Sequence, residues 1–235
     1  MAYYCKPAGG YSAGSTEGTG NIWQMHYALD SAGYALEAQC GVIGNSMAEG
    51  GLNPWRWQSD TVNYGAGYGL FQFTPANGYI GPMSWVTGYG PNLSVTQVSG
   101  GLVTDGDAQM YCLINDSLSK WVPYCWRDYW SAGDYPALWA LRTSILNTWG
   151  NGSTLTQSQF KNINDIQSAT FAFMACYEGQ LYPGDFSTRV NYANTVYSIL
   201  TGSPPPDPPP DPPIPPTPGS GIPIWLLFKL KEANS

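Results

Sequence analysis

The chain has 235 residues, which is room for one sizeable domain with an appendage. Its content of 43% hydrophobic and 11% charged residues permits a buried core and excludes wholesale disorder. The net charge of −7, with no basic stripe, argues against a nucleic-acid partner and favours a neutral or weakly charged polymer.

The first fifty residues predict an arm followed by two helices. Residues 1–20 are rich in Gly, Ser and Tyr, so we expect an irregular N-terminal arm, and without a basic start or an apolar run we expect no signal peptide. A helix opens at Asn21, runs through Leu29 and ends near Gly33. A second helix begins near Ala35 and carries an apolar stripe formed by Leu36, Cys40, Ile43 and Met47.

The centre of the chain predicts a change of structure. Residues 50–104 are dense in Gly, Asn, Thr, Tyr and Trp, with a few short β-like runs, which favours a small β-rich lobe. Helices return near Asp107, because four apolar stripes have helical spacing: Tyr111/Ile114/Leu118, Leu138/Leu141/Ile145/Trp149, Ile166/Thr170/Phe173/Tyr177 and Phe186/Val190/Ala193/Tyr197/Leu200. The expected fold class is therefore α+β, mainly α, with two lobes.

The C-terminal segment differs in composition from the rest. Eleven of the sixteen residues in 203–218 are proline, which predicts a stiff polyproline II linker about 50 Å long. Residues 219–235 follow, and their apolar run at 222–231 is too short to cross a bilayer. We interpret 219–235 as a docking peptide that inserts into a partner protein. The alternative is that it folds back onto its own domain.

The cysteines and the histidine give little sign of a redox, metal or thiol-protease site. Five cysteines without a CxxC pair favour neither a disulfide framework nor a zinc site, and we expect no metal and no cofactor. Cys40 and Cys176 fall on apolar helical faces and are expected to be buried thiols, while Cys112–Cys125 is the pair to test for a bridge. His26 is the only histidine, so a Cys/His peptidase is disfavoured.

Glu49 is the carboxylate best placed for chemistry. It comes at the end of the second helix, which Gly50-Gly51 terminates, and Trp55 and Trp57 follow closely. Desolvation by apolar neighbours raises the pKa of a carboxyl group, as a general acid requires. A lone glutamate at a helix end is nevertheless more often a solvated cap.

Several motifs resemble those of the phage tail lysozyme family. The run GNSMAEGGLNP at 44–54 is similar to its helix-end motif, and GYGLFQFTP at 67–75 to the Gly-Leu-x-Gln-x-x-Pro signature shared with goose-type lysozymes and lytic transglycosylases. Asn21-Ile22-Trp23, Ala169-Thr170-Phe171 with Tyr177-Glu178, and Arg189-Val190 with Tyr192-Ala193 match further segments in order. The resemblance spans about 21–200 and predicts a lysozyme-like catalytic domain at 21–202.

The resemblance implies roles for particular residues. Glu49 becomes the general acid that cleaves the glycan backbone of peptidoglycan between N-acetylmuramic acid and N-acetylglucosamine. The expected substrate-binding residues are Gln72, Phe73, Tyr177, Trp55 and Tyr68. Two departures from the family are Gly50, where serine is usual, and Gly179-Gln180, where Arg-Pro is frequent.

A hydrolase also needs a group that activates water or stabilises the oxocarbenium ion. Asp60 is our candidate for the second catalytic carboxylate, and a turn residue in Ser59-Asp60-Thr61 is the alternative. Weaker candidates are Glu178, Asp105 and Asp107. Without a second carboxylate the enzyme would be a lytic transglycosylase, in which the sugar's own 6-hydroxyl replaces water.

The expected function is local cell-wall degradation by a glycosidase carried in a phage tail. The segment 222–231 would bind tail structural proteins, and delivery by the virion would make an export signal unnecessary. Two alternatives stay open. One is an endolysin that is released from the host cytoplasm to the wall. The other is an inactive structural or glycan-binding component of the virion.

Overall fold

The computed structural model describes most of the N-terminal 202 residues. The described ranges are 3–6, 8–78, 105–116, 120–123, 131–178 and 183–202. Much of the predicted β-rich lobe (79–104), the proline linker and the docking peptide lie outside them. Within the described residues, no helix is long and apolar enough to cross a membrane.

The first helix, α1 (Thr16–Ser31), begins earlier than predicted. Ser15 caps it by accepting a hydrogen bond from the Gly18 amide at 3.0 Å, as serine commonly does at this position. The predicted start at Asn21 is wrong, because the glycines in this turn lie within the helix. Gly20 is required by packing instead, since the Tyr4 ring lies only 2.5 Å from where its Cβ would be.

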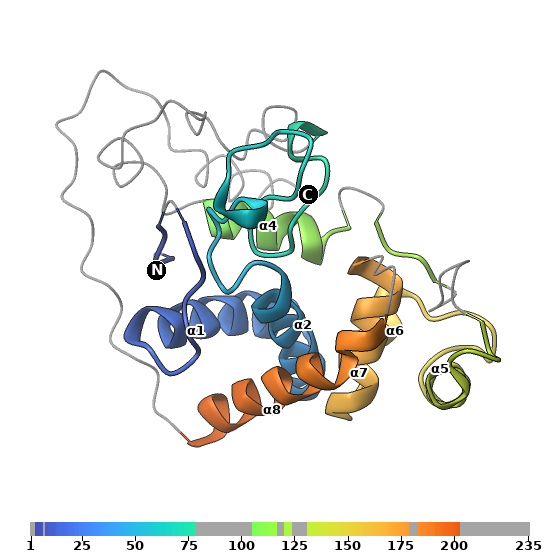
Figure 1. Ribbon diagram of the computed structural model, residues 1–235. Coiled ribbons are helices and arrows are strands. Elements are labelled where there is room, and N and C mark those ends of the chain that lie inside the picture. The colour runs from blue at the N-terminus through green and yellow to red at the C-terminus, as the bar shows by residue number, and fades with distance from the viewer. Residues whose placement is uncertain are drawn as a thin grey trace, which may run out of the picture.

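Helix α2 (Leu36–Glu49) confirms the second predicted helix, and it lies among α1, α7 (Ile166–Phe173) and α8 (Phe186–Gly202) (Figure 1). It packs against α7 and α8, and two glycines allow the close approach. A Cβ at Gly41 would lie 2.7 Å from the Ala169 carbonyl carbon, and one at Gly44 would lie 2.7 Å from the Ala193 amide. The C-terminal end of α2 is therefore held beside the N-terminal half of α8.

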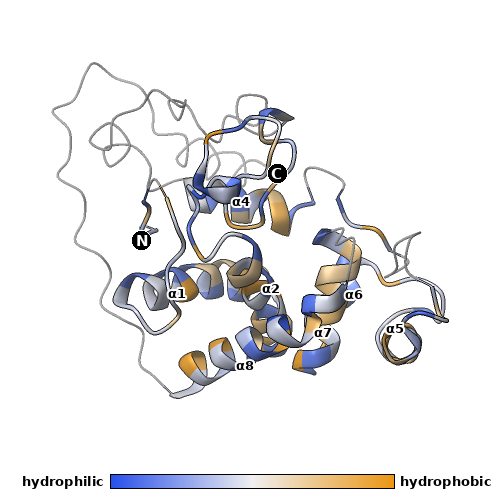
Figure 2. Ribbon diagram, in the orientation of Figure 1, coloured by the Kyte–Doolittle hydropathy of each residue, from blue (hydrophilic) through white to orange (hydrophobic). Residues whose placement is uncertain are grey.

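The remaining helices confirm that the described residues after 105 are mainly helical. They are α4 (Asp105–Ile114), α5 (Pro136–Thr148), the short α6 (Gln157–Phe160) and a π-helical turn, η4 (Met174–Glu178), that continues α7. One predicted stripe is wrong in detail, because Tyr111 is 52% exposed while Met110 and Leu113 are buried. Figure 2 shows the apolar character of α7, whose Phe171 and Phe173 belong to the core.

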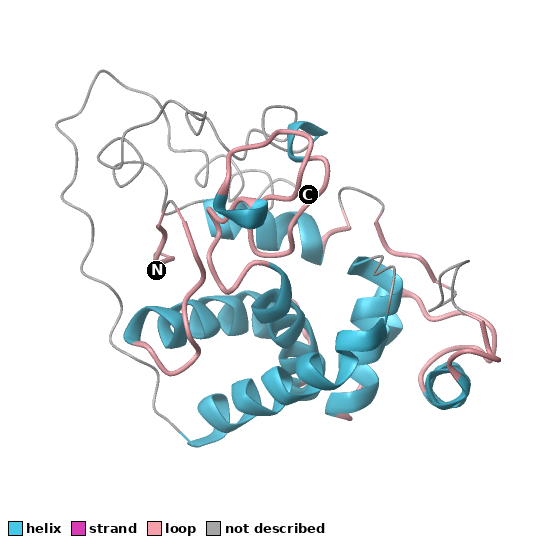
Figure 3. Ribbon diagram, in the orientation of Figure 1, coloured by secondary structure: helices cyan, strands magenta, loops and turns pink. Residues whose placement is uncertain are grey.

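The described part of the predicted β-rich lobe consists of turns. Residues 50–78 contain two isolated antiparallel bridges, Trp57–Tyr68 and Tyr68–Phe73, and the described chain has no strand (Figure 3). Positive φ angles at Gly51, Leu52, Gly69 and Gln72 curl the backbone tightly, which extended strands do not permit. The described fold is thus mainly helical.

The cysteine predictions need correction. Cys176 is disulfide-bonded, not the buried thiol that its helical face suggested. Cys112 forms no disulfide in the structure, so Cys112–Cys125, the pair to test, is not bridged. Helical periodicity identifies a buried face but carries no information about covalent pairing across the fold.

Candidate active site

Glu49 is the last residue of α2, and its side chain is 21% exposed. The helix ends at Gly50, whose amide donates to the Ser46 carbonyl at 2.9 Å. A Cβ at Gly50 would lie 2.4 Å from the Gly69 carbonyl oxygen and 2.6 Å from that of Leu70. The glycine therefore allows the 67–73 loop to lie directly against the end of the helix, so the structure brings the two central motifs together beside Glu49.

A buried arginine from α8 binds Glu49. The Arg189 guanidinium, 1% exposed, donates through Nη2 to Glu49 Oε1 and forms an ion pair with it. It also donates through Nε to Asp185 Oδ2, at 2.8 Å. The Asp185 side chain is 39% exposed, on the short helix η5 (Pro183–Asp185) that precedes α8. One cation thus joins two carboxylates from different elements.

Asn45 fixes the direction of this guanidinium. Its Oδ1 accepts from Arg189 Nη1 at 2.8 Å, and its Nδ2 donates to the Gly41 carbonyl at 2.8 Å and to the Thr170 carbonyl at 3.1 Å. Since both ends of the buried amide are engaged, Asn45 links α2, α7 and Arg189 in one network.

Arg189 keeps its positive charge although its side chain is buried. Burial by itself lowers the pKa of a guanidinium, but the neighbouring carboxylates of Glu49, Glu178 and Asp185 outweigh it and raise the pKa of Arg189. A buried charge of this kind persists only when it is paired and hydrogen-bonded, and here both conditions hold.

The 67–73 loop is anchored from two sides. Gln72, at a φ of 45°, donates from Nε2 to the carbonyls of Arg56 and Gly69, each at 3.0 Å. Gln109 on α4, fully buried, accepts from the Leu70 amide at 2.8 Å and donates to the Pro54 carbonyl at 2.8 Å. Gln72 is partly exposed.

The aromatic candidates are part of the core. The side chains of Trp55, Tyr68, Phe73 and Tyr177 are all buried. Tyr177 stacks on Phe173 with ring centroids 4.9 Å apart, and Tyr68 packs on Trp57 at 4.7 Å. In this arrangement the four rings support the loop and helix ends that surround Glu49, and their own faces are covered.

Asp60 sits on the molecular surface. It ends the 3-10 helix η1 (Gln58–Asp60), accepts from the Gly9 amide at 2.6 Å and lies 3.6 Å from Arg56 Nε. These contacts tie the N-terminal arm to η1 and fit the turn alternative. Of the weaker candidates, Asp107 is exposed on α4, whereas Glu178 ends η4 and interacts electrostatically with Arg189.

His26 and Cys40 lack the features of a nucleophilic pair. His26 Nδ1 lies 2.5 Å from Gln39 Oε1, and its ring packs on Trp23. Burial, together with Glu37, raises the pKa of Cys40 to about 12, the opposite of what an activated thiolate needs. Among the residues that the structure describes, no three His, Cys, Asp or Glu side chains converge as a metal site.

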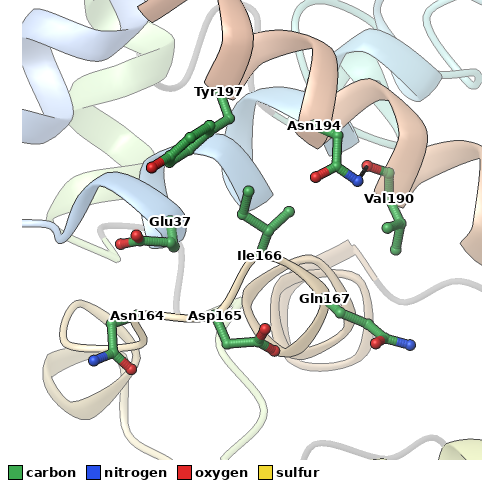
Figure 4. Close-up of a pocket in the computed structure, with 8 residues that line it drawn as sticks. All are labelled: Glu37, Asn164, Asp165, Ile166, Gln167, Val190, Asn194 and Tyr197. Atoms are coloured by element: carbon green, nitrogen blue, oxygen red, sulfur yellow. Dashed lines mark hydrogen bonds between the residues drawn. The ribbon is translucent and has the colours of Figure 1, made fainter. Parts of the chain in front are cut away.

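A hollow of about 410 Å³ lies near the other end of α2 (Figure 4). It is lined from α2, from the start of α7 and from α8 by Glu37, Asn164, Asp165, Ile166, Gln167, Val190, Asn194 and Tyr197. None of the predicted site residues belongs to this set. The hollow is therefore separate from the site at Glu49.

The sequence motifs pointed to Glu49 but missed how it is held. Asn45, Asp185 and Arg189 were given no role, although Asn45–Glu49 and Asp185–Arg189 are both i,i+4 pairs. Such spacing places two side chains on one helical face. What the spacing does not reveal is that the two faces meet.

Comparisons with known proteins identify the family of this chain. Residues 20–200 match the model of the phage tail lysozyme family, and the chain belongs to that family. The family suggested by the motifs is thereby confirmed. A segment of 49 residues is 43% identical to part of morphogenesis protein 1 of Bacillus phage B103. The matched segment makes up 20% of this chain and 13% of the length of that protein.

Proposed function

We propose that the protein is a tail-associated glycosidase that cleaves the glycan backbone of peptidoglycan, with Glu49 as general acid. The observation that supports this most is a partly exposed carboxylate at the end of a buried helix, oriented by Arg189 and flanked by the 67–73 loop. A positioned carboxyl of this kind can protonate the oxygen between N-acetylmuramic acid and N-acetylglucosamine as the bond breaks. Family membership supports the same substrate class.

The loop supplies the binding half of the proposal. Gln72 and the backbone of 70–73 would hydrogen-bond an N-acetylated sugar, while Phe73, Trp55, Tyr68 and Tyr177 hold the surface on which it lies. Water or the sugar's 6-hydroxyl completes the cleavage, giving a lysozyme or a lytic transglycosylase. Asp60 stays the candidate second carboxylate. Comparing the activities of Asp60→Asn and Glu178→Gln tests which of these two carboxylates the reaction needs.

Zymography on purified peptidoglycan tests the role of Glu49. We expect the parent protein to clear the wall and Glu49→Gln to lose at least about 100-fold in activity, since removal of a general acid costs about this much. Glu37→Gln, the same change at the other end of α2, is the control and should clear like the parent. Equal clearing by Glu49→Gln would refute the role of Glu49.

The inactive alternative is weakened by the reason for Gly50. Serine is usual in the family at this position, but a side chain there would collide with the carbonyls of Gly69 and Leu70. The glycine matches this packing, so it is no sign of lost function. An inactive module would leave the wall intact in the same zymogram.

A further inference from the structure

The arginine that binds Glu49 serves more than one anion. Three carboxylates act on the Arg189 guanidinium: Glu49 from α2, Glu178 from η4 and Asp185 from η5. Asn45 adds an uncharged amide oxygen. These charged and polar groups face a side chain that water hardly reaches.

This arrangement bears on how Glu49 can carry a proton. A general acid must be neutral when the substrate is bound, yet a neighbouring cation favours the ionised carboxylate. If Glu49 were the only partner of Arg189, its protonation would also leave a buried guanidinium unpaired, which is strongly unfavourable. A second carboxylate on the same guanidinium removes both obstacles, because it keeps Arg189 paired and reduces the positive potential at Glu49.

We propose that Asp185 is a positioning residue that acts through Arg189 to let Glu49 take up its proton. In the resting enzyme Arg189 is shared between Glu49 and Asp185. When Glu49 becomes neutral, Asp185 and Asn45 retain the guanidinium, so the site does not reorganise. The proposal rests on Glu49 being the catalytic acid, but the charge coupling that it describes exists in the resting protein and is measurable there.

The proposal predicts opposite effects for two substitutions. In Asp185→Asn the guanidinium keeps its charge and loses one counter-ion, so Glu49 is held in its ionised form. We expect the carboxyl titration midpoint of Glu49 and the alkaline limb of the pH–activity curve to move to lower pH than in the parent. In Arg189→Gln the cation is gone, and both should move to higher pH.

The measurement is a carboxyl titration by NMR on the full chain. The sequence has five glutamates, so labelling with ¹³C-glutamate gives five carboxyl signals, and the one missing in Glu49→Gln belongs to Glu49. Asp30→Asn, at an exposed position on α1, is the control for the loss of a single carboxylate and should leave the midpoint unchanged. Circular dichroism verifies that each variant is folded.

The outcomes separate the coupling from the function. A lower midpoint in Asp185→Asn, with the parent value in Asp30→Asn, supports the inference even if Arg189→Gln fails to fold. A midpoint that Asp185→Asn leaves unchanged, or raises, overturns it. If the midpoints move as expected but neither the parent nor any variant cleaves peptidoglycan, the coupling is supported and the proposed function is refuted.

Discussion

At the scale of single residues, the site depends on its glycines as much as on its charged side chains. Glu49 and Arg189 meet because Gly44 lets α8 approach α2, and the 67–73 loop reaches Glu49 because Gly50 leaves room for two carbonyls. A protein interior is packed too densely to absorb an added methyl group without strain.

Gly50→Ser, which restores the residue usual in the family, should therefore destabilise this protein. The new Cβ would lie within 2.6 Å of the Gly69 and Leu70 carbonyl oxygens, and we expect a loss of about 1–3 kcal/mol in the free energy of unfolding. Urea denaturation measures it. Gly14→Ser is the control, since nothing lies within 4 Å of a Cβ at Gly14. Equal stability of the two variants would contradict this account of Gly50.

At the scale of elements, the sequence predicted the helices better than the loop. Helix α2 follows from its apolar stripe and its glycine stop, whereas the start of α1 was misplaced because glycine marks both irregular chain and tight packing. The short β-like runs of 50–78 became turns because positive φ angles at Gly69 and Gln72 override local strand preference. Glu49 was found by its motif, but the Asn45–Arg189–Asp185 network arises only when α8 docks on α2.

The attachment of the loop to α4 can be tested at the same scale. Gln109→Met keeps the side-chain volume but leaves the Leu70 amide and the Pro54 carbonyl without the buried partner described above. We expect a loss of about 2 kcal/mol or more in stability, because unsatisfied buried polar groups are costly. Thermal unfolding measures it beside Gln167→Met, the same change at an exposed position of α7. Comparable melting temperatures would mean that Gln109 does not anchor the loop.

At the scale of the whole molecule, the described elements form one helical body that holds the site, and the family match ends at residue 200. We propose that the proline-rich 203–218 and the apolar 219–235 serve attachment to a phage tail.

Removal of residues 203–235 should separate attachment from catalysis. We expect the shortened protein to clear peptidoglycan like the parent while losing its association with phage particles during sedimentation. A variant that replaces only 222–231 with a Gly/Ser stretch keeps the linker and should also detach. Particle association that survives both changes would contradict the tether and favour a tail contact made by the helical body.

The central claim is that Glu49 delivers a proton to a glycosidic oxygen of peptidoglycan. Mass spectrometry of the soluble fragments released from purified sacculi tests it most directly. The account predicts disaccharide-peptide fragments from the parent and from Glu37→Gln, and none above background from Glu49→Gln. A reducing end identifies a lysozyme, and a 1,6-anhydro end, lighter by one water, identifies a lytic transglycosylase. The same fragments released at the same rate by Glu49→Gln would contradict the claim.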